Sequence, residues 1–271
     1  MIYESLWGPV YYKISGPEDA PVVVFTHGVT MDHCSFDSQV EALKDRYRTL
    51  IWDLPGHGRS FQLREKFTYS LAAMCILEVL DCVGAKQAVL IGVSLGGQIN
   101  QYAAFLQPER VAALIEVGSM AIHKPFGRLG NILGKLYIAV SRFIPEKQVY
   151  SWLAASRAIK PETRRYLEKK AGQMGKKQLL AITEAMFEDM AKGVPIAPEM
   201  PLLMIHGEKE LPFVVKHLQN WHKQTPDSVY AVIPDAGHLA NQDNPHAFNH
   251  VIAGFLDRVL ETPIQRGVYA R

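Results

Sequence analysis

The stretch that most constrains the fold is Ala88–Gly97, which reads Ala-Val-Leu-Ile-Gly-Val-Ser-Leu-Gly-Gly. Its apolar start predicts a short buried strand, and a helical pattern follows over about 98–106. Ser94 therefore lies in a G-x-S-x-G pentapeptide at a sharp turn from strand to helix. Such a turn strains the backbone and projects the hydroxyl above the sheet edge. The pattern favours a nucleophile at Ser94; the alternative is a glycine-bounded turn with an incidental serine.

The same turn predicts an oxyanion hole. The amide of Leu95 would lie at the positive end of the following helix, where negative charge is stabilised. A second amide would follow the first buried strand, 22–26. Val29, which comes after His27 and Gly28, is the candidate.

A serine hydroxyl becomes a good nucleophile when a base takes its proton, and the base needs an acid that orients it. His238 follows the last predicted strand, 229–233, so it should lie at the same carboxyl edge of the sheet as Ser94. The acid would come from the residues after the strand at 202–205. We predict Glu210, with Glu208 as the alternative.

Strands alternate with helices along most of the chain, which predicts an α/β fold with a mostly parallel sheet and helices on both faces. The first predicted strand, 8–15, would be an edge strand. Between 119 and 199 the pattern is helical throughout. We therefore predict a core of residues 1–118 and 200–271, with residues 119–199 inserted as a helical cap, or lid, over the active-site edge.

The first helix of the predicted cap is amphipathic, with Ile132, Leu136 and Val140 at helical spacing. Attachment of this helix to a membrane is the alternative, but Arg128, Lys135 and Arg142 interrupt it. No uncharged stretch approaches the length of a membrane span, so we predict no stable membrane insertion.

Charge is distributed unevenly. Residues 119–199 contain 14 Lys and Arg against 7 Asp and Glu, a net charge of +7, which leaves −5 on the remainder. A basic cap over a mildly acidic core would steer an anionic substrate or an acyl carrier protein to the site. A solvated surface without such a role is the other interpretation. The cations that would bind a carrier are Arg164, Arg165, Lys169 and Lys170.

The sequence gives little support to other classes of protein, such as nucleic-acid-binding, metal-binding or secreted proteins. The net charge of +2 argues against a nucleic-acid-binding protein. Cys34, Cys75 and Cys82 lack metal-ligand spacing and are predicted to be buried thiols in a reducing compartment. The N-terminus lacks a signal-peptide pattern, so we expect a cytoplasmic protein. Phosphate-loop, dinucleotide and zinc motifs are missing, so we predict no cofactor and no metal.

Taken in order, the motifs resemble those of the α/β-hydrolase superfamily over essentially the whole chain outside the cap. They are His27-Gly28, Asp53-Leu-Pro-Gly-His-Gly-Arg-Ser60, Gly92-Val-Ser-Leu-Gly-Gly97, His206-Gly-Glu-Lys-Glu210 and Gly237-His238. The resemblance implies that Ser94 is the nucleophile and His238 the base, with the Val29 and Leu95 amides as oxyanion hole. The family usually has aspartate where Glu210 stands. A serine at 94 argues against the epoxide-hydrolase and dehalogenase branches, which attack with a carboxylate.

The sequence thus predicts a cofactor-independent serine hydrolase of the esterase or lactonase type. It would cleave carboxylic esters or lactones through an acyl-enzyme on Ser94, and the apolar cap suggests a small hydrophobic acyl substrate. Two alternatives stay open. One is a carbon–carbon bond hydrolase with the same triad, and the other is a ligand-binding or signalling protein on a hydrolase scaffold.

Overall fold

The computed structural model describes residues 1–124 and 127–261; residues 262–271, which belong to the predicted core, lie outside the described residues. The described chain forms an eight-stranded sheet in the order β1-β2-β4-β3-β5-β6-β7-β8. The pairs β1–β2 and β2–β4 are antiparallel, and all later pairs are parallel. The strands are β1 (Ile2–Ser5), β2 (Gly8–Ser15), β3 (Val22–Thr26), β4 (Arg48–Trp52), β5 (Ala88–Val93), β6 (Val111–Val117), β7 (Leu202–Gly207) and β8 (Val229–Ile233).

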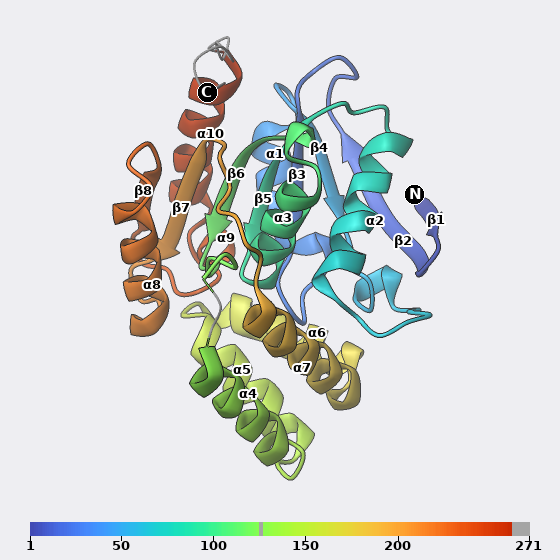
Figure 1. The fold of residues 1–271 in the computed structure, drawn as a ribbon, viewed down its shortest axis with the longest axis vertical. Coiled ribbons are helices and arrows are strands. Elements are labelled where there is room, and N and C mark those ends of the chain that lie inside the picture. The colour runs from blue at the N-terminus through green and yellow to red at the C-terminus, as the bar shows by residue number, and fades with distance from the viewer. Residues whose placement is uncertain (125–126, 262–271) are drawn as a thin grey trace.

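Helices cover both faces of this sheet (Figure 1). Leu80 on α2 (Tyr69–Cys82) and Ile99 on α3 (Leu95–Leu106) belong to a buried apolar cluster on one face. Val40 and Phe248, on α1 and α10, belong to the cluster on the other face. The predicted α/β fold is therefore confirmed. The helices are α1 (Asp37–Leu43), α2 (Tyr69–Cys82), α3 (Leu95–Leu106), α4 (Gly127–Ser141), α5 (Glu146–Arg157), α6 (Pro161–Met174), α7 (Lys176–Lys192), α8 (Pro212–Lys223), α9 (Ala240–Asp243) and α10 (Pro245–Glu261).

The central strands are apolar throughout because both of their faces are covered. In β3, Val24 packs into the cluster on the α2–α3 face, whereas Val23 and Phe25 pack into the cluster on the α1–α10 face. All five residues of β3 are buried. This packing holds the carboxyl ends of β3 and β5 in register, with Thr26 opposite Gly92.

The predicted edge strand 8–15 is not at the edge. β1 pairs with it, Ile2 lying opposite Tyr11, and becomes the outer strand. Because Ile2 is 58% exposed, this strand lacks the buried apolar alternation by which strands are found in sequence.

In the sequence, helices α4–α7 come between β6 and β7. In space, they are grouped next to the carboxyl ends of the strands (Figure 1). The apolar stripe on α4 faces solvent, with Ile132 61%, Leu136 57% and Val140 52% exposed. None of the helices in the described ranges combines the length and the apolar character that crossing a bilayer requires.

A different face of α4 packs inward. Ile138 is buried there. Gly134 also faces inward, and its missing side chain leaves room for the ring of Phe187 on α7, which a Cβ would approach to 2.6 Å. The helix was therefore predictable from its spacing, but the face it buries depends on a glycine contact with a later helix.

All three cysteines are free thiols. Cys75 is buried in α2, as predicted. The prediction was wrong for Cys34 and Cys82, which are exposed. Cys82 is the last residue of α2, and Cys34 lies on a short 3-10 helix (His33–Phe36).

Candidate active site

Ser94 occupies a strained turn between β5 and α3. Its φ is +54° and its ψ is −117°, a conformation that residues with a side chain rarely adopt. Close packing behind the turn requires the flanking glycines. A Cβ on Gly92 would lie 2.3 Å from the amide nitrogen of Gly97, and a Cβ on Gly96 would lie 2.1 Å from the carbonyl oxygen of Thr26. The G-x-S-x-G spacing therefore follows from the packing of α3 against the sheet.

A buried carboxyl lies directly behind this turn. Glu116, on β6, is fully buried, and a Cβ on Gly97 would come within 2.2 Å of its Oε2. The same oxygen accepts a hydrogen bond of 3.0 Å from Gln101 Nε2. Burial raises the pKa of Glu116 to about 7, because the charged form loses its hydration.

We expect Glu116→Gln to change how the free energy of unfolding depends on pH. The carboxyl has a pKa of about 7 in the fold, against 4.5 for an ordinary glutamate. Between these two pH values the Glu116 carboxyl is protonated in the folded state and ionised in the unfolded state. The contribution of Glu116 to the free energy of unfolding therefore falls as the pH rises through this window, by up to about 3 kcal/mol. Because glutamine cannot ionise, the variant should gain stability relative to the wild type over this window and keep the gain above it.

Urea unfolding at several pH values measures this difference. Glu109→Gln, which removes an exposed carboxyl, is the matched control. A constant difference between the wild type and Glu116→Gln from pH 4.5 to 7 would contradict the prediction.

The structure brings His238 and Glu210 together from the loops after β8 and β7. Oε2 of Glu210 lies 2.7 Å from Nδ1 of His238, and Oε1 accepts a hydrogen bond of 2.7 Å from the Leu211 amide. Burial opposes ionisation of Glu210, but His238, the Leu211 amide and the charge of Arg157 together outweigh burial and lower the pKa of the carboxyl. Glu208, the alternative acid, is 50% exposed and accepts a hydrogen bond from the Asp235 amide instead.

Ser94 and His238 both lie against the turn Val117–Gly118. The Ser94 amide donates to the Val117 carbonyl (2.8 Å). Gly118 has a φ of +56°, and a Cβ there would lie 2.8 Å from both His238 Nδ1 and Glu210 Oε2. Nε2 of His238 is buried and has no hydrogen-bond partner among the described residues. The catalytic hydrogen bond from a serine to its base is often long in the absence of substrate, so this free nitrogen remains available to Ser94.

The loop after β3 also lies against the serine. A Cβ on Gly28 would approach Ser94 Cβ to 3.4 Å. His27 fixes this loop through both nitrogens of its ring. Nδ1 lies 2.8 Å from the Gly28 carbonyl oxygen, and Nε2 accepts a 3.0 Å hydrogen bond from the backbone amide of Leu54, which follows β4. Within the described part of the chain, the amides of Val29 and Leu95 donate to no other residue. Both predicted oxyanion donors are thus free to bind a ligand.

Comparison with known proteins decides the family. Residues 21–245 match the family model described as the alpha/beta hydrolase fold. The chain belongs to the α/β-hydrolase family. The resemblance drawn from the motifs is therefore confirmed.

Two relatives extend over nearly the whole chain. The uncharacterized hydrolase YugF of Bacillus subtilis is 26% identical over 257 residues, which are 91% of this chain and 94% of that protein. The 3-oxoadipate enol-lactonase 1 of Acinetobacter baylyi is 25% identical over 258 residues, 91% of this chain and 92% of that protein. The family and the names of these relatives support hydrolase activity on a small molecule.

A solved structure shows the same fold. The enol-lactonase from Burkholderia xenovorans LB400 superposes with a TM-score of 0.81 at 18% sequence identity, covering 94% of this chain and 99% of that one. The likeness extends through the helical segment as well as the sheet, because so little of either chain is left out.

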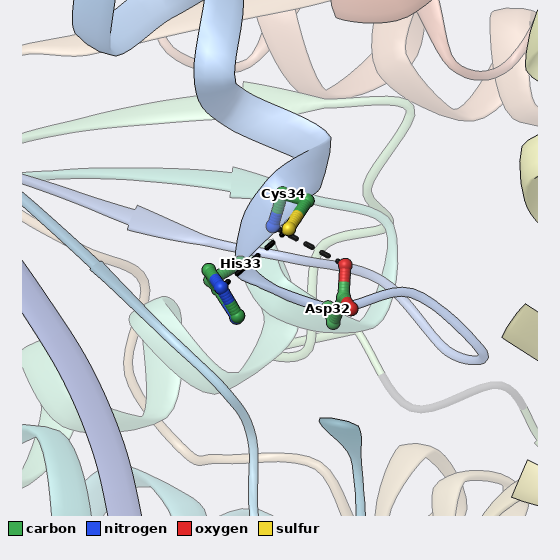
Figure 2. Close-up of side chains that lie close together, drawn as sticks. All are labelled: Asp32, His33 and Cys34. Carbon is green, nitrogen blue, oxygen red and sulfur yellow. Dashed lines mark hydrogen bonds between the residues drawn. The ribbon is translucent and has the colours of Figure 1, made fainter. Parts of the chain in front are cut away.

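A second group of chemically active side chains in this α/β-hydrolase lies beside the site. Asp32, His33 and Cys34 place donor atoms within 4.8 Å of one another (Figure 2). Asp32 accepts a 2.9 Å hydrogen bond from the Tyr166 hydroxyl and pairs with Lys170, both on α6. His33 Nδ1 lies 2.8 Å from Oδ1 of the buried Asp53. Partial burial and the charge of Asp32 raise the pKa of the Cys34 thiol to about 11. Metals bind deprotonated thiols and unpaired carboxylates, whereas here the thiol holds its proton and Asp32 is already paired with α6. This cluster is therefore better suited to joining α6 to the loop after β3.

Asp243 was missed by the sequence analysis. Its Oδ2 accepts hydrogen bonds from the amides of Gly237 (2.9 Å) and Ile159 (3.0 Å), which ties the α5–α6 connection of the hydrolase to the loop of His238. The signal in the sequence is weak, since an aspartate five residues after a candidate base has many explanations. Its role depends on contact with a residue 84 positions away.

Proposed function

We propose that this α/β-hydrolase cleaves carboxylic esters or lactones through an acyl-enzyme on Ser94. The observation that carries the proposal is a strained, half-buried serine that contacts the same turn, Val117–Gly118, as the hydrogen-bonded His238–Glu210 pair. The relative named as an enol-lactonase supports the same class of substrate.

In the first half of the reaction, His238 Nε2 takes the proton of Ser94 Oγ while this oxygen attacks the carbonyl carbon. The oxyanion that forms accepts hydrogen bonds from the Val29 and Leu95 amides. Collapse of the tetrahedral intermediate breaks the bond to the alkoxy oxygen, which receives the proton from His238. Glu210 stabilises the imidazolium throughout. An acyl group now esterifies Ser94.

In the second half, His238 takes a proton from water and the resulting hydroxide attacks the acyl carbon. The same two amides hold the second oxyanion. The bond to Ser94 Oγ then breaks, the oxygen recovers its proton from His238 and the carboxylic acid leaves. No step requires a cofactor or a metal.

Residues 119–199 act in this proposal as the cap that covers a small hydrophobic acyl group. An acyl carrier protein would dock on their basic surface through the exposed side chains of Arg165 and Lys169. Lys170 is less available, because it pairs with Asp32. Arg164 also makes a 2.7 Å hydrogen bond, through its Nε, to the carbonyl of Ala158.

A panel of 4-nitrophenyl esters of increasing acyl length, an enol-lactone and a dienone acid tests the proposed function. We expect hydrolysis of the esters and the lactone, with the highest kcat/KM for short to medium acyl chains, because a capped pocket excludes long ones. Turnover of the dienone acid alone would instead indicate a carbon–carbon bond hydrolase. Absence of all turnover, together with no labelling by a fluorophosphonate, would indicate a ligand-binding protein.

A further inference from the structure

Arg157 ends α5 directly against the loop that carries His238. Its carbonyl oxygen accepts a 3.2 Å hydrogen bond from the Leu239 amide. A Cβ on Gly237 would lie 3.2 Å from the same oxygen. The backbone of Arg157 is thus held beside the proposed base by contacts on both sides of His238.

The guanidinium of Arg157 has no hydrogen bond or ion pair with any residue in the described part of the chain. The side chain is nevertheless half-buried, and burial lowers the pKa of Arg157. The charge lies close enough to the proposed acid to help lower the pKa of Glu210, and it is also near the hydroxyl of Tyr137 on α4. The cation is therefore near both α4 and the His238–Glu210 pair.

Such a cation is unfavourable by itself. A charge that loses part of its hydration without gaining a hydrogen-bond partner destabilises a fold. The charge of Glu210 relieves this only in part: it opposes the lowering of the Arg157 pKa, but the carboxylate makes its hydrogen bonds to His238 and Leu211 and none to the guanidinium. A planar guanidinium with free donors matches a carboxylate, which it binds through two parallel hydrogen bonds.

We infer that Arg157 binds a carboxylate of the substrate, so that the preferred substrates are esters or lactones that carry a second, free carboxylate. The inference rests on the proposed function, since it places this carboxylate beside the ester that Ser94 attacks. Arg157 is a specificity residue here: it holds the far end of the substrate and takes no part in the chemical steps.

Two esters of equal chain length test this inference: mono(4-nitrophenyl) glutarate, which ends in a carboxylate, and 4-nitrophenyl pentanoate, which ends in a methyl group. We expect the wild type to prefer the glutarate ester. Arg157→Gln should lower kcat/KM for the glutarate ester about 10- to 100-fold, chiefly through KM, because charged hydrogen bonds are lost. The same variant should change kcat/KM for the pentanoate ester by less than about threefold, because no charged bond to that ester is lost.

Lys147→Gln is the matched control, because it removes one positive charge from an exposed position of the same helix. It should leave both esters unaffected, and Arg157→Lys should restore part of the preference. Equal losses on both esters in Arg157→Gln, or no preference in the wild type, would overturn the inference.

Calorimetric titration of glutarate separates this inference from the proposed function. If the wild type hydrolyses neither ester, the proposed function fails, but glutarate should still bind the wild type and not Arg157→Gln. If glutarate does not bind the wild type, Arg157 does not form a carboxylate site, and this conclusion holds whether or not the esters are hydrolysed. Tighter binding of inorganic phosphate than of glutarate would lead to the same conclusion, since it would assign the site to phosphate esters.

Discussion

Ser94→Ala is expected to lower kcat for ester hydrolysis by about 10⁵-fold or more, because no other group can form the acyl-enzyme. The fold should persist, since the hydroxyl of Ser94 does not cap α3, and the packing of α3 against β3 and β5 depends on Gly92 and Gly96 instead. Stopped-flow hydrolysis of a 4-nitrophenyl ester measures the loss. Covalent labelling by a fluorophosphonate, followed by intact-mass analysis, should give one adduct on the wild type and none on the variant.

Ser156→Ala provides the control for this experiment. Ser156 is an exposed serine on α5 whose hydroxyl donates only to the carbonyl of Leu153, 2.9 Å away. Its replacement should change neither the rate nor the labelling. A Ser94→Ala protein that is still labelled, or that retains more than about 1% of the wild-type rate, would rule out Ser94 as the nucleophile.

The parts of this hydrolase that were predictable from sequence are those fixed by local geometry. The turn at Ser94 needs glycines within two residues on each side, so its motif is contiguous in the chain. The helix that starts after Thr68 is another case, because the Thr68 side chain accepts a hydrogen bond from the Leu71 amide (3.1 Å) as an N-cap. Buried parallel strands such as β3 are also predictable, because helices cover both of their faces and the strands read as unbroken apolar runs.

The features that escaped prediction depend on contacts between distant segments. Asp243 holds Ile159 across 84 positions, and nothing near either residue in the sequence indicates the pair. The side of α4 that packs inward depends on Gly134 fitting the ring of Phe187. Arg157 is one of many cations in a basic segment, and only its enclosed position beside His238 separates it from the others. Specificity is thus harder to predict than the catalytic motif.

Glu210→Gln is expected to lower kcat by about 10³- to 10⁴-fold without preventing the protein from folding. The pKa of Glu210 is lowered in the fold, so the wild-type carboxylate is ionised at neutral pH and accepts the Nδ1 proton of His238. A glutamine amide can donate to Nδ1 instead. The proton of the imidazole would then sit on Nε2, which could no longer accept the proton of Ser94.

Glu210→Asp should lose less, about 10- to 100-fold in kcat, because it keeps the charge but withdraws the carboxylate by one methylene from the 2.7 Å contact with Nδ1. Glu208→Gln should leave kcat unchanged, since Glu208 is exposed and bonds elsewhere. The comparison of the three variants decides which glutamate orients the base. A large loss in Glu208→Gln, or wild-type rates in Glu210→Gln, would mean that the short hydrogen bond to His238 is structural and that another group performs the role of the acid.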